Sequence, residues 1–231
     1  YNELREEFNA LLGDKKLIRD TEDKETGIVS HTRGGFDLTF SAPKSVSVAG
    51  LVMDDKRLIE AHKEATLETM TYIEKHFAQT RVYENKQRIH ETTSNLSYAS
   101  FTHYTSRAVD FNMPDPQLHT HNFIFNMTKS NDGIVRSLDN IEIARAVKLA
   151  GQIYQNSLAS KVQDLGYNIQ WEKTGDNYTF EIKGIDNVVL DNYSKRTEQI
   201  DKAIIEKEQE LGRKLTDDEK AIINLETRVS K

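Results

Sequence analysis

Two histidines lie two positions apart in the stretch DPQLHTHNFIF, between a proline turn and an apolar run. If this stretch forms a strand, the side chains of His119 and His121 leave the same face, because strand side chains alternate with a period of two. Two imidazoles on one face of a stiff backbone can chelate a metal ion if further groups complete the set. The spacing therefore predicts part of a metal site.

A third histidine, His103, lies in the preceding β-like run and shares a strand face with Phe101. The connection to the next run is long enough for the two runs to lie side by side, so that His103, His119 and His121 would form a three-imidazole face. Neutral imidazoles favour Mn, Zn, Ni or Co over Mg on affinity, although cellular availability often decides which ion is used. The expected cofactor is a divalent ion: Mg or Mn in the cell, with Zn, Ni or Co as alternatives.

Asp37, in the strand-like GFDLTF, is the candidate to accept the second ring N–H of a metal-bound histidine. An ordinary salt-bridged carboxylate is the alternative. Chance pairs of histidines are also common at surfaces and in cores, so a structural role stays open for the pair at 119 and 121. The other four histidines share no face and are expected to be structural or exposed: His31, His62, His76 and His90.

The bulk composition excludes several classes of protein. The formal net charge of the 231 residues is −6, so a nucleic acid would have to be met by a local basic patch or by a bound cation. The chain has no cysteine, which excludes disulfides and thiolate metal sites and fits a cytoplasmic location. No apolar run is long enough to span a membrane, and no signal peptide is present.

Periodicity predicts an α+β fold, a mainly antiparallel sheet with flanking helices. Beyond a helix over Asn2–Leu12, it places a strand at Phe36–Phe40, a short helix after Pro43 and an amphipathic helix over the DDKRL…HFAQ segment. The later elements are three β-like runs (80–83, 96–104 and 118–128), a helical region from a cap at Asp139 to about Gly166, a hairpin around 175–177 and a helical end. We expect one domain over residues 1–231, with a sheet and metal-site core over 1–185 and a helical part over 186–231.

Five segments carry a resemblance to a known family, in the family's order: GGFDLTFSAPKSVSV, FTHYTSRAVDFNMPDPQLHTHNFIFNMT, YQNSLASKVQDLGY, YSKRTEQI and TRVSK. Together they resemble the relaxase domain of MobF-type conjugative relaxases over essentially the whole chain. These proteins are HUH endonucleases with a palm-like antiparallel sheet.

The resemblance implies a metal-dependent enzyme that nicks and rejoins single-stranded DNA at a plasmid transfer origin through a phosphotyrosine intermediate. His103, His119 and His121 match the metal ligands, and Asp37 matches the aspartate that orients a ligand histidine or accepts the nucleophile's proton. The implied partners are origin DNA, a fused C-terminal helicase, and relaxosome and type IV secretion proteins.

Other positions are open. The family's nucleophilic tyrosine lies upstream of the segment matched by Tyr1, so we expect this chain to be a piece of a longer protein that lacks it and does not nick alone. Lys44 and Arg107 are candidate phosphate contacts near the metal, with solvated surface cations as the alternative. A non-catalytic single-stranded DNA-binding module, or an unrelated HxH metallo-hydrolase, would be the competing functions.

Overall fold

The computed structural model describes residues 20–22, 29–31, 34–107, 113–175 and 177–227. The helix expected over Asn2–Leu12 lies outside this part. The chain folds as two compact units, and each unit draws on three separate segments. Unit 1 covers Tyr1–Phe40, Lys63–Thr102 and Thr120–Leu158, and unit 2 covers Ser41–His62, His103–His119 and Ala159–Lys231.

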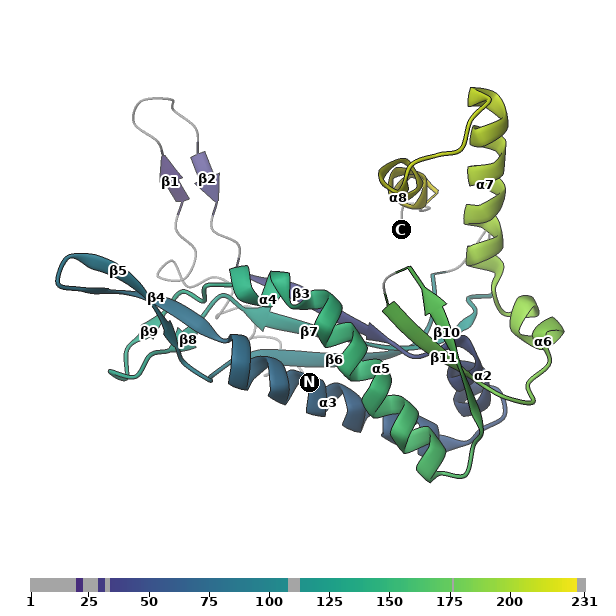
Figure 1. The fold of residues 1–231 in the computed structure, drawn as a ribbon, viewed down its shortest axis with the longest axis horizontal. Coiled ribbons are helices and arrows are strands. Elements are labelled where there is room, and N and C mark those ends of the chain that lie inside the picture. The colour runs from purple at the N-terminus through teal and green to yellow at the C-terminus, as the bar shows by residue number, and fades with distance from the viewer. Residues whose placement is uncertain (1–19, 23–28, 32–33, 108–112, 176, 228–231) are drawn as a thin grey trace. The chain divides into compact units, whose positions relative to one another are not determined.

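A three-stranded sheet has the order β3-β7-β6 (Figure 1). It carries Asp37 and the three histidines predicted as metal ligands. Its strands are β3 (Gly35–Ser41), β6 (Tyr98–Thr105) and β7 (Pro116–Phe125). Backbone hydrogen bonds join Gly34 to Asn126 and Ala42 to Leu118. The residue number therefore rises along β3 as it falls along β7, so the two strands are antiparallel. The expected strand at Phe36–Phe40 and the α+β class are confirmed.

Gly35 allows β3 to approach β7 closely. A Cβ at this position would collide with the carbonyl oxygen of Ile124 and the ring of Phe123. Beyond it, exposed Asp37 and Thr39 alternate with buried Leu38 and Phe40, as expected for a strand with one covered face.

In the described part of the chain, the other strands form two-stranded elements. They are β1 (Asp20–Glu22) with β2 (Val29–His31), β4 (Gln79–Glu84) with β5 (Gln87–Thr92), β8 (Thr128–Lys129) with β9 (Val135–Arg136), and β10 (Ile169–Thr174) with β11 (Asn177–Ile182). The hairpin expected around residues 175–177 is confirmed as β10–β11, but β5 was not expected from the sequence. Its turn uses Asn85 and Lys86, both at positive φ (51° and 64°), which is the backbone of a two-residue type I′ hairpin turn.

The helices are α2 (Lys44–Leu51), α3 (Lys56–Phe77), α4 (Ile141–Arg145), α5 (Val147–Asp164), α6 (Asn187–Asn192), α7 (Lys195–Leu211) and α8 (Asp217–Glu226). Pro43 is the N-cap residue of α2, in agreement with the short helix expected after Pro43, and Ser41 ends β3. The cap expected at Asp139 lies one residue before the N-cap position of α4, Asn140. The Asp139 carboxylate nevertheless accepts from the amide of Ile141 at 3.5 Å, and it also binds Arg81. None of the described helices is long and apolar enough to cross a membrane.

Each unit has its own buried apolar side chains. Those of unit 1 come mainly from α3, α5 and the sheet and include Phe40, Met70, Ile73, Ile124, Tyr154 and Leu158. Those of unit 2 come mainly from α2, the start of α3, and β11 and include Val46, Val48, Leu58, Leu118, Val162 and Phe180.

Candidate functional site

His121 lies in unit 1 with a hydrogen-bonded carboxylate beside it. Its Nδ1 is 2.5 Å from Oδ2 of Asp37 and 2.9 Å from Oγ1 of Thr39, whose hydroxyl donates to the same carboxylate oxygen at 2.9 Å. A carboxylate oxygen only accepts, so Nδ1 of His121 carries the proton and donates it. In the neutral ring the lone pair is then on Nε2, which is the state required of a metal ligand.

β3 and β7 place these groups together because both strands turn one face to the interior. In β7, Thr120 and Asn122 are buried while His121 is half-buried on the other face. The buried Asn122 donates its side-chain amide to the carbonyl of Leu38, which links β7 to β3 beneath the pair. Thr39 was not singled out in the sequence, although its place two residues after Asp37 on a strand predicts a shared face.

The other two histidines lie in unit 2. The rings of His103 and His119 are stacked, with their centroids 5.3 Å apart and their planes at 21°. Nδ1 of His119 is 3.0 Å from the carbonyl oxygen of Gln117, an acceptor, so this ring also donates from Nδ1 and has its lone pair on Nε2. Imidazole nitrogens are suitable ligands for a divalent transition ion. The rings of His121 and His119 are each held in the ligating tautomer by a hydrogen-bond acceptor at Nδ1.

The structure brings the predicted residues together in two pairs: His121 with Asp37, and His103 with His119. Among the described residues, no group of three or more His, Asp or Glu side chains could hold a metal ion. That all three histidines bind one ion therefore stays a prediction. It depends on the shared strand β7 for His119 and His121, and on the neighbouring strand β6 for His103.

Lys44 is held by backbone carbonyls in unit 2. Its ammonium donates to the carbonyl of Tyr193 at 2.7 Å and of Pro116 at 3.3 Å. Burial lowers the pKa of Lys44, against the raising effect of Asp115 and Glu181 nearby. These contacts favour a structural role for Lys44, and its contact with DNA stays a prediction.

The serines around Lys44 also have structural partners. The amide of Ser45 donates to Glu181 at 2.8 Å, and its hydroxyl accepts from the amide of Ile182 at 2.7 Å. The hydroxyl of Ser47 accepts from the amide of Leu118 at 3.0 Å. The segment SAPKSVS, residues 41–47, therefore ties α2 to β11 and to the start of β7.

Arg107 is exposed just before the segment 108–112, which lies outside the described part, and its contact with DNA also stays a prediction. Of the other histidines, His62 is fully buried, and His90 is half exposed with Nδ1 3.0 Å from Asp139, as a structural role requires. Arg196, in the motif YSKRTEQI, donates to the carbonyls of Thr227 at 2.7 Å and Asn224 at 2.9 Å, which braces α7 against α8.

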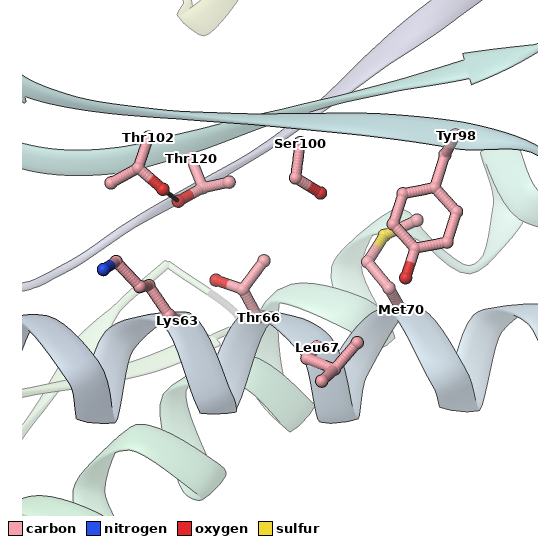
Figure 2. Close-up of a pocket in the computed structure, with 8 residues that line it drawn as sticks. All are labelled: Lys63, Thr66, Leu67, Met70, Tyr98, Ser100, Thr102 and Thr120. Carbon is pink, nitrogen blue, oxygen red and sulfur yellow. Dashed lines mark hydrogen bonds between the residues drawn. The ribbon is translucent and has the colours of Figure 1, made fainter.

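A cavity of about 250 Å³ in unit 1 lies between α3 and the sheet (Figure 2). It is lined by Lys63, Thr66, Leu67, Met70, Tyr98, Ser100, Thr102 and Thr120. Thr120 precedes His121 in β7, so the cavity opens on the opposite face of that strand from His121. Thr102 and Thr120 lie on neighbouring strands in the sheet wall of the cavity (Figure 2) and are hydrogen-bonded at 2.9 Å, whereas the buried hydroxyl of Thr66 has no hydrogen-bond partner among the described residues. The cavity is therefore separate from the Asp37–His121 pair.

Comparison with known proteins identifies consistent relatives. The TrwC relaxase family model matches residues 3–231. Multifunctional conjugation protein TraI of Escherichia coli is 38% identical over 74% of this chain, which spans only 10% of the length of that relative.

Two solved structures of a relaxase share the fold. The metal-bound structure of conjugative relaxase TrwC in complex with oriT DNA has a TM-score of 0.82 and 37% sequence identity. The match covers 98% of this chain and 75% of the TrwC chain. TrwC complexed with a 27-mer DNA comprising the recognition hairpin and the cleavage site has a TM-score of 0.80 and 35% identity, with 98% and 78% covered.

Proposed function

Since this chain belongs to the TrwC relaxase family, as its motifs predicted, we propose that it serves in the strand-specific nicking and rejoining of single-stranded DNA at a plasmid transfer origin. The observation that carries the proposal is the tautomer of His121, held by Asp37 through a 2.5 Å hydrogen bond. Family membership sets aside the unrelated HxH metallo-hydrolase.

We propose that His103, His119 and His121 together hold one divalent ion through their ring nitrogens, with Asp37 orienting His121. Neutral ligands would leave the full charge of the ion to polarise a scissile phosphodiester. Asp37 acts by keeping the proton of His121 on Nδ1, and the carbonyl of Gln117 does the same for His119. The relatives' metal-bound form supports a divalent ion, and Mg or Mn is our choice for the cell.

Three of the described tyrosines are poorly suited to be the nucleophile, in keeping with the expectation from the family resemblance that it comes from outside this chain. Burial raises the pKa of Tyr98 and raises that of Tyr154 further, and a hydrogen bond to Asp55 raises the pKa of Tyr167. A raised pKa makes the attacking phenolate scarcer at neutral pH, the opposite of what nucleophilic catalysis needs. We therefore expect this chain alone to bind origin DNA without nicking it.

The test is formation of a covalent adduct on a transfer-origin oligonucleotide in Mn²⁺, with this chain and with a version extended upstream along its gene. The extended protein should form a 5′-phosphotyrosyl adduct, and His121→Ala should abolish it. His76→Ala is the matched control, because His76 is an exposed histidine on α3. An extended protein that has intact histidines, binds the oligonucleotide and yet forms no adduct would contradict the proposal.

A non-catalytic single-stranded DNA-binding module is the second candidate, favoured by the absence of a three-ligand group among the described residues. It predicts DNA affinity that is unchanged by EDTA and by the loss of His103. The relaxase proposal further expects action on plasmid DNA in the cytoplasm, beside a helicase, relaxosome proteins and type IV secretion proteins.

A further inference from the structure

Strands β4 and β5 form a two-stranded ribbon in unit 1 (Figure 1). The register places most of its positive charge on one face and its carboxylates on the other. The register pairs Arg81 with His90 and Tyr83 with Arg88. Directly opposed residues of antiparallel strands share a face, and residues two apart do so as well. One face therefore carries three potential cations and a tyrosine, without a carboxylate.

The other face carries both carboxylates of the ribbon. Glu84 is opposite Gln87, and Glu91 is opposite Thr80. Glu91 is also used within the fold, since it accepts from the amide of Asn131 at 2.7 Å. The net charge of the ribbon is small, but the positive charge is gathered on one side.

At one end of the basic face, Arg81 and His90 are held in place by the carboxylate of Asp139. The buried carboxylate of Asp139 receives Nε of Arg81 at 2.9 Å and lies 3.0 Å from Nδ1 of His90. Burial alone would raise the pKa of Asp139, but the hydrogen bond and the charge of Arg81 lower it overall, so Asp139 stays ionised. Arg81 and His90 therefore anchor the ribbon to the fold and are not part of the proposed binding surface.

The outer part of the same face is presented to solvent. Tyr83 is 77% exposed, Arg88 opposite it is exposed as well, and so is Lys86 in the turn that joins the two strands. Within the described part of the chain, no hydrogen bond or ion pair involves the side chains of these three residues. An exposed aromatic ring beside two cations is the combination that binds single-stranded nucleic acid, because the ring can stack on a base while the cations meet phosphates.

We propose that Tyr83 stacks on an unpaired base of single-stranded DNA, while Arg88 and Lys86 contact its phosphates. This inference rests on the proposed function for its partner, and it assigns a DNA contact outside the histidine face. A single strand fits better than a duplex because the flat face of a base is accessible only where the base is unpaired. The contacts of Asp139 with Arg81 and His90 fix this end of the ribbon, so the ring and the cations are positioned in the free protein.

The test is fluorescence anisotropy of this chain with a labelled oligo-dT and with a duplex of equal length, over a series of salt concentrations. Tyr83→Ala should weaken oligo-dT binding about tenfold, and Tyr83→Phe should restore most of the affinity. Arg88→Ala should reduce the slope of log affinity against log salt by about 0.7, the effect of losing one phosphate contact on a single strand.

Gln87→Ala is the matched control, because Gln87 is exposed on the other face of the same ribbon and should bind DNA as the parent does. Thermal unfolding of every variant separates lost contact from lost structure. Equal affinities of the parent and Tyr83→Ala for oligo-dT would overturn the inference and leave the proposed function standing. A parent chain without any affinity for single-stranded DNA would overturn both, and equal losses on the duplex would refute the stacking.

Discussion

At the scale of single residues, the metal proposal depends on the position of the proton on the ring of His121. Asp37 and Thr39 together hold Nδ1 of the ring, and a histidine that is fixed in this way presents Nε2 to an ion without first choosing a tautomer. Asp37 is thus expected to act through His121 rather than on the ion itself.

Asp37→Ala should therefore weaken the affinity for Mn²⁺ by about 10- to 100-fold, the usual effect of losing a group that orients a ligand. Calorimetric titration of the ion into the DNA-free chain measures this directly. Asp54→Ala, at an exposed ion pair with Lys56, is the control and should bind like the parent. Unchanged affinity in Asp37→Ala would mean that the hydrogen bond does not serve a metal site.

Thr66 shows the opposite situation, a buried hydroxyl without a described hydrogen-bond partner. An unsatisfied buried group costs stability, so Thr66→Val, which keeps the shape of the side chain, should raise the free energy of unfolding by about 1 kcal/mol. Urea denaturation measures the change. Thr69→Val is the comparison, because the hydroxyl of Thr69 donates to the carbonyl of Ala65 at 2.8 Å and its loss should not stabilise.

A loss of stability in Thr66→Val would show that solvent in the adjoining cavity satisfies the hydroxyl. The cavity would then be a hydrated part of the fold.

At the scale of elements, the clearest local design is the start of α8. Thr216 and Glu219 form a capping box, each accepting from the backbone of the other, and Arg213 pairs with Glu219 at 2.6 Å. The hydrogen bond from Arg213, followed by that from the amide of Thr216, lowers the pKa of Glu219 from 4.5 to about 2. The ionised carboxylate is therefore the form that the folded chain prefers.

The pH dependence follows from this shift. Because the pKa is lower in the folded chain, the contribution of Glu219 is complete above about pH 4.5 and is lost as the pH falls towards 2. Glu219→Gln should flatten the decline of the thermal midpoint across this window. Arg213→Ala should move the decline to higher pH, and a Glu219→Gln profile that follows the parent throughout would contradict this role.

At the scale of the whole molecule, the two units share covalently continuous elements. The boundaries between units fall within β3, α3, β6, β7 and α5, so no single loop separates them. One unit cannot unfold without breaking helices and strands that continue into the other. The expected division into 1–185 and 186–231 stays a prediction.

We therefore expect one cooperative unfolding transition. Far-UV circular dichroism reports all helices, and the single tryptophan, Trp171, reports β10 in unit 2. The two urea curves should coincide. Separate midpoints would show that the units unfold independently despite the shared elements.

The sequence by itself determined the family, the α+β class, most of the elements and the suspicion of a histidine site, because periodicity, turn residues and motif order are local properties. It missed β5, whose alternating pattern is mostly polar, and it placed the cap of α4 at Asp139, one residue before the N-cap position Asn140.

Only the tertiary structure decided which partners these residues have. Asp37 and His121 are 84 positions apart, and Lys44 meets Tyr193 across 149. No spacing rule predicts such contacts, because they depend on how strands pair and helices pack. The fold thus made Asp37 the partner of His121, and it gave Lys44 backbone carbonyl partners in a half-buried position.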